Sequence, residues 1–246
     1  MKKIIRLILV ILVCMNNNAL TQVDYKETST EQENKSKRDF DVAILTLRGQ
    51  QTIKYAATIN QMRGFLFDEY PYLCNRDAKS EALFTEHYVH CDDNLLIVAK
   101  DINSGSVVGL ITAMPLNAPS VSLELKDMRK LFIGKKYDLD DIFYLSISFL
   151  LPEYRGLGIG SLMYETCEKA IRQRGTFKFI TLCGIDRGDD KGNARRPPNY
   201  KTPYNLWLKE GYVRRNDMMQ SYWWRDLGSR DLTNHYMVFW MKTLNI

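Results

Sequence analysis

The sequence lacks any Cys-x-x-Cys pair, and its five cysteines are scattered and odd in number. This spacing excludes the common zinc and thioredoxin-like motifs and gives no disulfide framework, so we predict no metal site. The three histidines have no patterned partners that would indicate a metal or catalytic site.

The part of the chain expected to fold also lacks a strong charge of either sign. Residues 1–38 hold seven Lys and Arg against four Asp and Glu, which leaves residues 39–246 with a formal charge of only +2 out of the total of +5. A nearly balanced domain gives no electrostatic reason to expect a nucleic acid as partner.

No apolar run approaches the roughly 20 residues that a membrane-spanning helix needs. A short run, Leu7 to Val13, follows the basic residues Lys2, Lys3 and Arg6, which is the pattern of an export signal. We therefore expect residues 1–19 to export the protein or to anchor it to a membrane. Two alternatives stay open, namely a lipid attached to Cys14 and a cytoplasmic protein translated from Met15.

Residues 20–39 are polar and too poor in apolar side chains to fold alone, so we interpret them as a linker. Residues 40–246 are expected to form one domain. Apolar periodicity and turn residues predict four strands, at Val42–Leu47, Ile142–Leu151, Phe177–Cys183 and Tyr236–Leu244. They also predict a hairpin in which Leu95–Ala99 pairs with Val107–Met114. Helices are expected over 51–70, in a segment with Ser80 as its N-cap, over Leu123–Leu131, in a segment that starts at Ile159, and over Tyr204–Lys209.

The most informative segment is Arg155-Gly-Leu-Gly-Ile-Gly-Ser161, which follows a predicted strand and opens a predicted helix. The unpaired N–H groups and the positive dipole end of a helix start together bind phosphate oxygens. The glycines at 156, 158 and 160 allow a ligand to approach the backbone closely. Arg155 is expected to add a positive charge at the mouth of the turn.

Two well-known phosphate motifs do not fit this segment. A P-loop has a Lys before the Ser or Thr that follows its last glycine, whereas Ser161 follows Gly160 directly. A dinucleotide fingerprint needs its third glycine where Ser161 stands, and too few residues follow for a whole dinucleotide-binding sheet. A tight strand-to-helix turn without any ligand is the alternative that stays open.

The segment from Arg155 to Gly160 resembles the pyrophosphate-binding motif of the GNAT N-acetyltransferase superfamily, Gln/Arg-x-x-Gly-x-Gly/Ala. The segment from Asn205 to Tyr212 resembles the late helix of that superfamily and the start of its sixth strand. The order of the predicted elements also agrees. The resemblance implies an α/β fold with a mixed, mostly antiparallel sheet of six to seven strands flanked by helices, in which two strands splay beside the glycine turn. A closer similarity, to a bacterial subgroup of unassigned substrate, rests on Glu69–Leu73, Leu151–Arg155, Thr181–Arg187, Arg196–Tyr200 and Met237–Lys242.

The resemblance implies direct transfer of an acetyl group from acetyl-CoA, as co-substrate, to an amine of a small-molecule or peptide acceptor. The backbone of Phe149, Leu150 and Leu151 would contact the acetyl carbonyl and the pantetheine arm, and the strand edge would stabilise the oxyanion. The pyrophosphate would be held by Arg155, Gly156, Leu157, Gly158, Ile159, Gly160 and Ser161.

Two departures from the family pattern bear on the catalytic residues. The superfamily often has a tyrosine acid where this chain has Trp207, and the closer subgroup has an acidic residue where this chain has Ile147. The neighbouring phenols Tyr204 and Tyr200 are the candidate acids, with packing or a substrate loop as their alternative roles. A non-catalytic acyl-CoA-binding regulatory module and a transferase of another acyl group are therefore the alternative functions.

Overall fold

The structure is a computed structural model that describes residues 41–118, 123–188 and 194–244, all of them in the unit Asp39–Ile246. The expected signal-like segment 1–19 and the expected linker 20–39 lie outside the described residues. Among the residues that are described, no helix has the length and the apolar character needed to cross a membrane.

One seven-stranded sheet organises the described residues, with the strand order β1-β2-β3-β4-β5-β7-β6. Only β4 and β5 are parallel neighbours, and every other neighbouring pair is antiparallel. The expected mixed, mostly antiparallel sheet is thus confirmed. The strands are β1 Val42–Arg48, β2 Leu95–Asp101, β3 Val107–Pro115, β4 Ile142–Leu150, β5 Phe179–Asp186, β6 Val213–Arg225 and β7 Leu232–Thr243.

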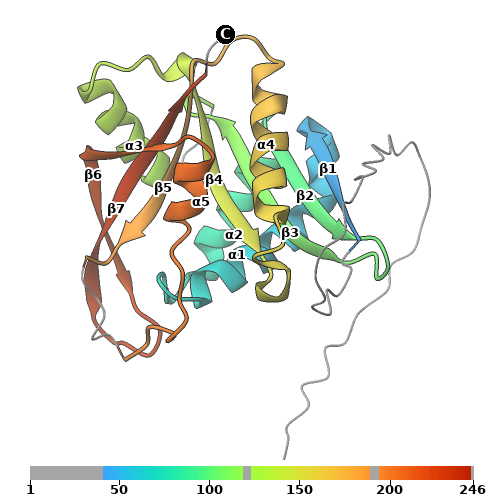
Figure 1. Cartoon of the computed structure of the whole chain (residues 1–246). Coiled ribbons are helices and arrows are strands. Elements are labelled where there is room, and N and C mark those ends of the chain that lie inside the picture. The colour runs from blue at the N-terminus through green and yellow to red at the C-terminus, as the bar shows by residue number, and fades with distance from the viewer. Residues whose placement is uncertain (1–40, 119–122, 189–193, 245–246) are drawn as a thin grey trace, which may run out of the picture. The chain divides into compact units, whose positions relative to one another are not determined.

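Helices cover both faces of this sheet. In Figure 1, α4 and α5 lie on the face turned toward the viewer, and α1 and α2 lie behind the sheet. Each face has its own apolar core, one built on α4 residues such as Met163 and Cys167, the other on residues such as Ile59 of α1 and Phe132 of α3. The helices are η1 Gly49–Tyr55, α1 Ala56–Asp68, α2 Ala78–Val89, α3 Leu123–Gly134, η2 Leu139–Asp141, η3 Pro152–Tyr154, α4 Ile159–Arg172 and α5 Tyr204–Lys209.

The starts of two helices differ in detail from the expectation, and the N-cap expected at Ser80 was wrong. The predicted helix over 51–70 begins as the 3-10 helix η1 and becomes α-helical only at Ala56. The N-cap of α2 is Asp77 rather than Ser80, since the Asp77 carboxylate accepts the Ser80 backbone N–H at 2.9 Å and the Ser80 hydroxyl at 2.7 Å. Asp and Ser are both good N-cap residues. Asp77 lies three positions before Ser80, so its carboxylate reaches the backbone N–H of Ser80, which has no partner within the helix.

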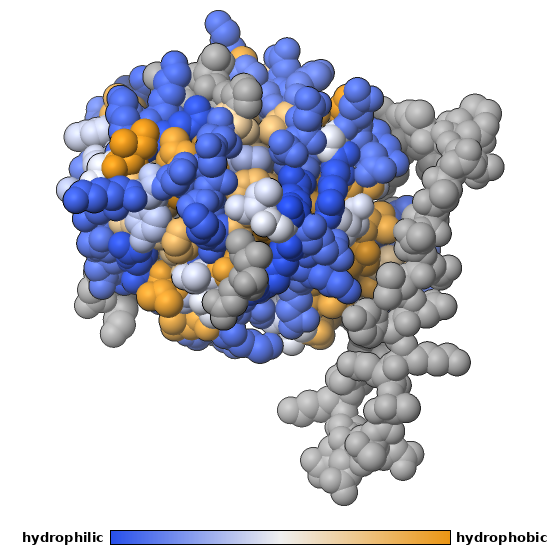
Figure 2. All heavy atoms as spheres, turned by 90° about the horizontal axis from the view of Figure 1, so that it is seen from above, coloured by the Kyte–Doolittle hydropathy of each residue, from blue (hydrophilic) through white to orange (hydrophobic). Residues whose placement is uncertain are grey.

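The surface seen in Figure 2 is mostly hydrophilic, with apolar residues in small and separate groups. Single apolar residues of this kind are normal on a protein surface and do not by themselves mark a binding site.

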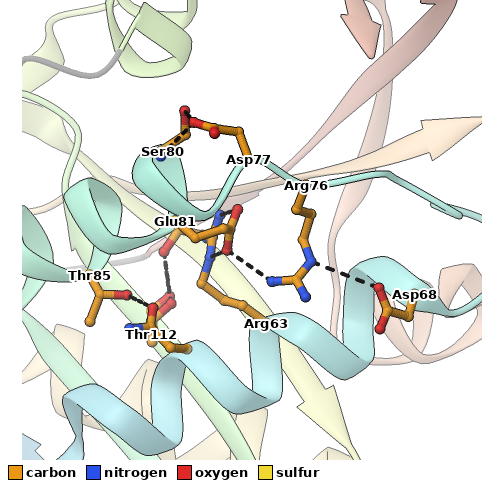
Figure 3. A network of polar contacts seen from close by, with 10 residues as sticks. Arg63, Asp68, Arg76, Asp77, Ser80, Glu81, Thr85 and Thr112 are labelled. Atoms are coloured by element: carbon orange, nitrogen blue, oxygen red, sulfur yellow. Dashed lines mark hydrogen bonds and ion pairs between the residues drawn. The ribbon is translucent and has the colours of Figure 1, made fainter. Parts of the chain in front are cut away.

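A buried ion pair joins α1 to α2 behind the sheet (Figure 3). Arg63 of α1 donates to both carboxylate oxygens of Glu81 of α2, at 2.7 and 3.1 Å, and only 7% of the Arg63 side chain is exposed. Its guanidinium also lies 3.8 Å from the centroid of the Phe84 ring. Arg76 approaches Glu81 at 3.5 Å and Asp68 at 3.9 Å, so the network also secures the end of α1.

We expect Glu81→Gln to lower the free energy of unfolding by about 3–5 kcal/mol, because the Arg63 charge would stay buried without its carboxylate. Urea unfolding of the purified protein measures this loss. The matched control is Asp127→Asn, which breaks the exposed pair of Asp127 and Lys130 and should cost about 0–1 kcal/mol. Equal losses in the two variants would contradict the structural role of the Arg63–Glu81 pair.

Candidate functional site

The parallel strands β4 and β5 separate partway along their length. Their residues pair from Ile142↔Phe179 to Leu145↔Leu182 and, within these fully described strands, no further, although β4 continues to Leu150 and β5 to Asp186. The predicted splay of two strands is therefore present, and it opens toward the turn that precedes α4 (Figure 1).

A β-bulge lies where the gap begins. The β3–β4 register shifts so that Thr112 pairs with Ile147 and Ala113 with Leu145, which leaves Ser146 as the extra residue. The Ser146 hydroxyl lies 2.8 Å from the Thr112 hydroxyl oxygen and 3.2 Å from the Thr112 carbonyl oxygen. Bulges redirect the strand and often lie beside active sites.

The edge of β4 offers backbone donors to the gap. The Leu151 N–H donates to the Val108 carbonyl of β3 at 2.8 Å, so it is not available to a ligand in the gap, contrary to our expectation. Because successive residues of a strand direct their backbone groups to opposite sides, Phe149 also faces β3, while Leu150 and Ser148 face the gap. The sequence named Leu150 as a contact of the pantetheine arm and did not name Ser148.

The glycine turn has an open, left-handed backbone at the start of α4. Gly156 and Gly158 have φ values of 79° and 85°, and a Cβ at either residue would meet no described atom within 4 Å. Gly158 is the N-cap of α4, and no side chain of the described residues caps this helix start. Its orphan N–H groups and the adjoining open space fit an oxyanion such as a phosphate.

The other predicted residues of the turn have distinct surroundings. A Cβ on Gly160 would lie 3.4 Å from Leu206, so this glycine serves the approach of α5 rather than the open space. The Leu157 side chain is exposed, whereas that of Ile159 is buried in the α4 core, so Ile159 offers only its backbone to a ligand. Just before the turn, Tyr154 donates to the buried Asp101 at 2.9 Å. The Ser104 N–H and this phenol hold the pKa of Asp101 below its ordinary value.

Arg155 does not supply the free positive charge that the sequence suggested. Its Nε donates to the Leu150 carbonyl at 2.7 Å, and its guanidinium pairs with the Glu69 carboxylate at 2.9 Å. The charge is thus neutralised, and the side chain braces the turn against the end of β4 and the connection after α1. The cation at the helix start is instead Lys209 of α5, whose Nζ donates to the Ser161 hydroxyl at 3.1 Å.

The two predicted phenols lie on the β5 side of the gap. The Tyr204 hydroxyl donates to the Ile185 carbonyl at 2.7 Å, and its ring packs against the Trp207 and Trp240 rings. The Tyr200 ring packs edge-on against Tyr70 with centroids 4.7 Å apart. Because the Tyr204 hydroxyl donates its proton to a backbone carbonyl, this geometry favours the packing role of Tyr204 over a role as an acid.

The two departures from the family pattern have clear surroundings. Ile147 is buried in the core behind the sheet. Trp207 is buried on the α4 side of the gap, where its Nε1 donates to the Tyr164 hydroxyl at 2.8 Å. A tyrosine on the buried face of a predicted helix was the available signal for this pair, since buried hydroxyls need partners.

A cavity of about 240 Å³ lies between the end of α1 and the end of β4, lined by Phe65, Asp68, Glu69, Phe149, Leu151 and Pro152. Two of its six lining residues are carboxylates and two are aromatic. Farther along the connection after α1, the phenol of Tyr72 lies near Cys183 and Tyr204, and burial raises its pKa well above the usual range. Because Glu69 is already paired with Arg155, Asp68 and the aromatic groups are what this side of the gap offers to a cationic ligand.

Comparisons with known proteins agree with this geometry. Residues 59–192, more than half of the chain, match the sequence profile described as the acetyltransferase (GNAT) family. A search of curated proteins found no match.

Solved structures with the same fold are distant in sequence. NAA60 of Arabidopsis thaliana, in complex with a bisubstrate analogue, superposes with a TM-score of 0.52 at 13% identity over 82% of this chain and 99% of that one. An aminoglycoside 6'-N-acetyltransferase complexed with coenzyme A gives a TM-score of 0.50 at 15% identity over 82% of this chain and 98% of that one. At these identities the structures show a shared fold, and the profile match shows the family. This chain therefore belongs to the GNAT acetyltransferase family.

Proposed function

We propose that this acetyltransferase transfers the acetyl group of acetyl-CoA to an amine inside the gap between β4 and β5. The observation that carries the proposal is that the unpaired edge of β4 ends beside an uncapped helix start with an open glycine turn. The edge of β4 can bind the amide groups of the pantetheine arm, and the start of α4 beside it can bind the pyrophosphate of the same extended molecule.

Acetyl-CoA supplies the thioester whose acetyl carbon the amine attacks. The N–H groups of the turn and of the first residues of α4 hold the pyrophosphate, assisted by Lys209. The N–H groups of Ser148 and Leu150 face the gap and are placed to bind the pantetheine arm and the oxyanion. Ile147 stands where the closer subgroup has an acidic residue, and in this proposal the amine proton passes to water.

We further propose that the acceptor is a cationic amine that enters from the side of α1. Asp68 lines the cavity there together with the Phe65 and Phe149 rings, beside the Glu69 carboxylate that pairs with Arg155. Carboxylates and aromatic faces attract a protonated group on the acceptor, while its unprotonated nitrogen attacks the thioester.

The direct test follows CoA release by chromatography when the full chain is mixed with acetyl-CoA and panels of small amines, polyamines and peptides. The expected result is release that depends on a cationic amine, with the acetylated amine identified by mass spectrometry. Binding of acetyl-CoA in calorimetry without release across the panels would instead leave the chain as an acyl-CoA-binding module.

Lys209→Gln should weaken CoA binding by about 3- to 10-fold, because it removes one cation beside the pyrophosphate, a contact worth about 1 kcal/mol. Calorimetry at two salt concentrations measures the loss, which should shrink at the higher salt. The control is Lys169→Gln, the same change on an exposed residue near the other end of α4. A CoA affinity that falls equally in both variants would show only a general effect of charge.

A further inference from the structure

The connection after α1, residues 69–77, is held to the ends of both separated strands. On the β4 side, Glu69 pairs with Arg155, which donates to the Leu150 carbonyl at the end of that strand. On the β5 side, the connection contacts Arg187, the first residue after β5. The connection therefore passes from the end of one strand to the end of the other, across the mouth of the gap.

Arg187 fastens the connection by two hydrogen bonds to its backbone. Its Nε donates to the Pro71 carbonyl at 2.7 Å, and its Nη2 donates to the Tyr72 carbonyl at 3.0 Å. The side chain is only 15% exposed, so water competes little for these donors. Because a guanidinium holds its donors in a rigid planar fork, two neighbouring carbonyls bound to it fix the direction of the segment as well as its position.

Asp226, just after β6, holds Arg187 in place. Its carboxylate lies 3.6 Å from the Arg187 Nη2 and 3.2 Å from Nε2 of the buried His235. The Trp224 ring stacks on the imidazole with centroids 3.8 Å apart, which fixes the orientation of His235. Burial lowers the pKa of His235, so the imidazole is neutral at neutral pH and the charge of Asp226 is left to Arg187.

The backbone after β6 binds the same part of the connection. The Leu227 N–H donates to the Leu73 carbonyl at 2.6 Å, and the Asn75 N–H donates to the Arg225 carbonyl at 2.7 Å. Leu73 has a φ of 48°, in the left-handed region that leucine rarely adopts. Such a conformation persists only where its surroundings determine it, and Arg187 and the β6–β7 hairpin supply these surroundings.

The acceptor side of the gap depends on where the connection runs. Asp68, the last residue of α1, lines the cavity there and comes directly before the connection. Its side chain is 57% exposed and its contact with Arg76 is long, at 3.9 Å, so the backbone largely sets the position of the carboxylate. A connection fastened at both ends thus fixes the carboxylate that is proposed to attract the cationic acceptor.

We propose that Arg187, held by Asp226, is a positioning residue for the acceptor amine. It fastens the connection after α1 across the mouth of the gap and thereby sets where the Asp68 carboxylate lies. Arg187 acts through the backbone that it binds and moves no proton in the reaction. This inference rests on the proposed function of the gap and assigns the group that maintains its acceptor side.

Steady-state kinetics of the full chain, with the amine of the panel that gives the fastest CoA release, test this role. Arg187→Gln should raise the KM for the amine about 10-fold, because two hydrogen bonds from a charged donor are lost. The kcat and the KM for acetyl-CoA should change by less than about 2-fold, because the loss concerns binding of the amine alone. Arg187→Lys keeps a charged donor without the fork and should recover part of the loss. Asp226→Asn should raise the same KM by a smaller factor, since the guanidinium keeps its two carbonyls.

The matched control is Arg214→Gln, the same change on an arginine of the same neighbourhood. Arg214 pairs with Asp186, the residue directly before Arg187, and not with the connection. This variant should leave the KM for the amine unchanged. An equal rise in both variants would refute the assignment, because it would show a general effect of removing positive charge near the end of β5.

Hydrogen exchange of the protein without any ligand, followed by mass spectrometry, gives a readout that does not depend on turnover. In Arg187→Gln, peptides from residues 69–77 should exchange about 10-fold faster, while peptides from α4 should exchange as in the unchanged protein. Unchanged exchange over 69–77 would overturn the inference, as would faster exchange there with an unchanged KM for the amine. Faster local exchange in a chain that acetylates no amine of the panel would instead sink the proposed function and leave the fastening by Arg187 established.

Discussion

Gly158→Glu is expected to leave a folded protein that binds CoA at least about 100-fold more weakly, a loss of about 2.7 kcal/mol or more. Gly158 has a φ of 85°, so any side chain there costs about 1–3 kcal/mol of strain, which the fold should withstand. The new side chain enters open space at the N-terminus of α4. Its carboxylate would occupy the helix start and repel the pyrophosphate.

The same helix provides the control for this prediction. Gly175, just past the C-terminal end of α4, has a φ of 70° and an equally open Cβ position among the described residues. Gly175→Glu should therefore cost a similar amount of stability in urea unfolding and should keep CoA affinity in calorimetry. A folded Gly158→Glu protein with unchanged CoA affinity would remove the glycine turn from the proposed site.

The architecture was predictable because its signals are local. The apolar run of β4, the Asn103-Ser104-Gly105 turn of the β2–β3 hairpin and the glycine turn before α4 each depend on residues close in sequence. Helix ends were less predictable. Asp77 and Ser80 are both capping residues, and the choice between them depends on where the chain enters α2.

The details of the site depend on contacts between distant residues. The point at which β4 separates from β5 depends on which residues of the two strands pair, and the apolar pattern of each strand does not determine that. Arg155 was predicted as a phosphate ligand from its place in the motif, but its partner Glu69 is supplied by a segment far away in the sequence. Lys209 was missed for the same reason, because only the packing of α5 beside α4 brings it to Ser161.

Gly184→Ala is expected to lower both stability and turnover, although it adds a single methyl group. Its Cβ would lie 2.6 and 2.9 Å from two ring carbons of Trp207, and overpacking of this kind costs about 1–3 kcal/mol. The ring can relieve the clash only by moving, and movement breaks its hydrogen bond to Tyr164. We therefore expect a lower urea midpoint together with a loss of kcat, because the ring that moves packs on β5 at the edge of the gap.

The double variant Gly184→Ala with Trp207→Phe separates these two effects. The smaller ring makes room for the added methyl group, so the double variant should be at least about 1 kcal/mol more stable than the sum of the two single losses predicts. Phenylalanine has no N–H group, so Tyr164 stays without its donor and kcat should stay low. Stability losses that simply add would show that the ring does not press on residue 184. Recovery of kcat along with stability would show that Trp207 acts through packing alone, because the hydrogen bond from its indole would then be dispensable.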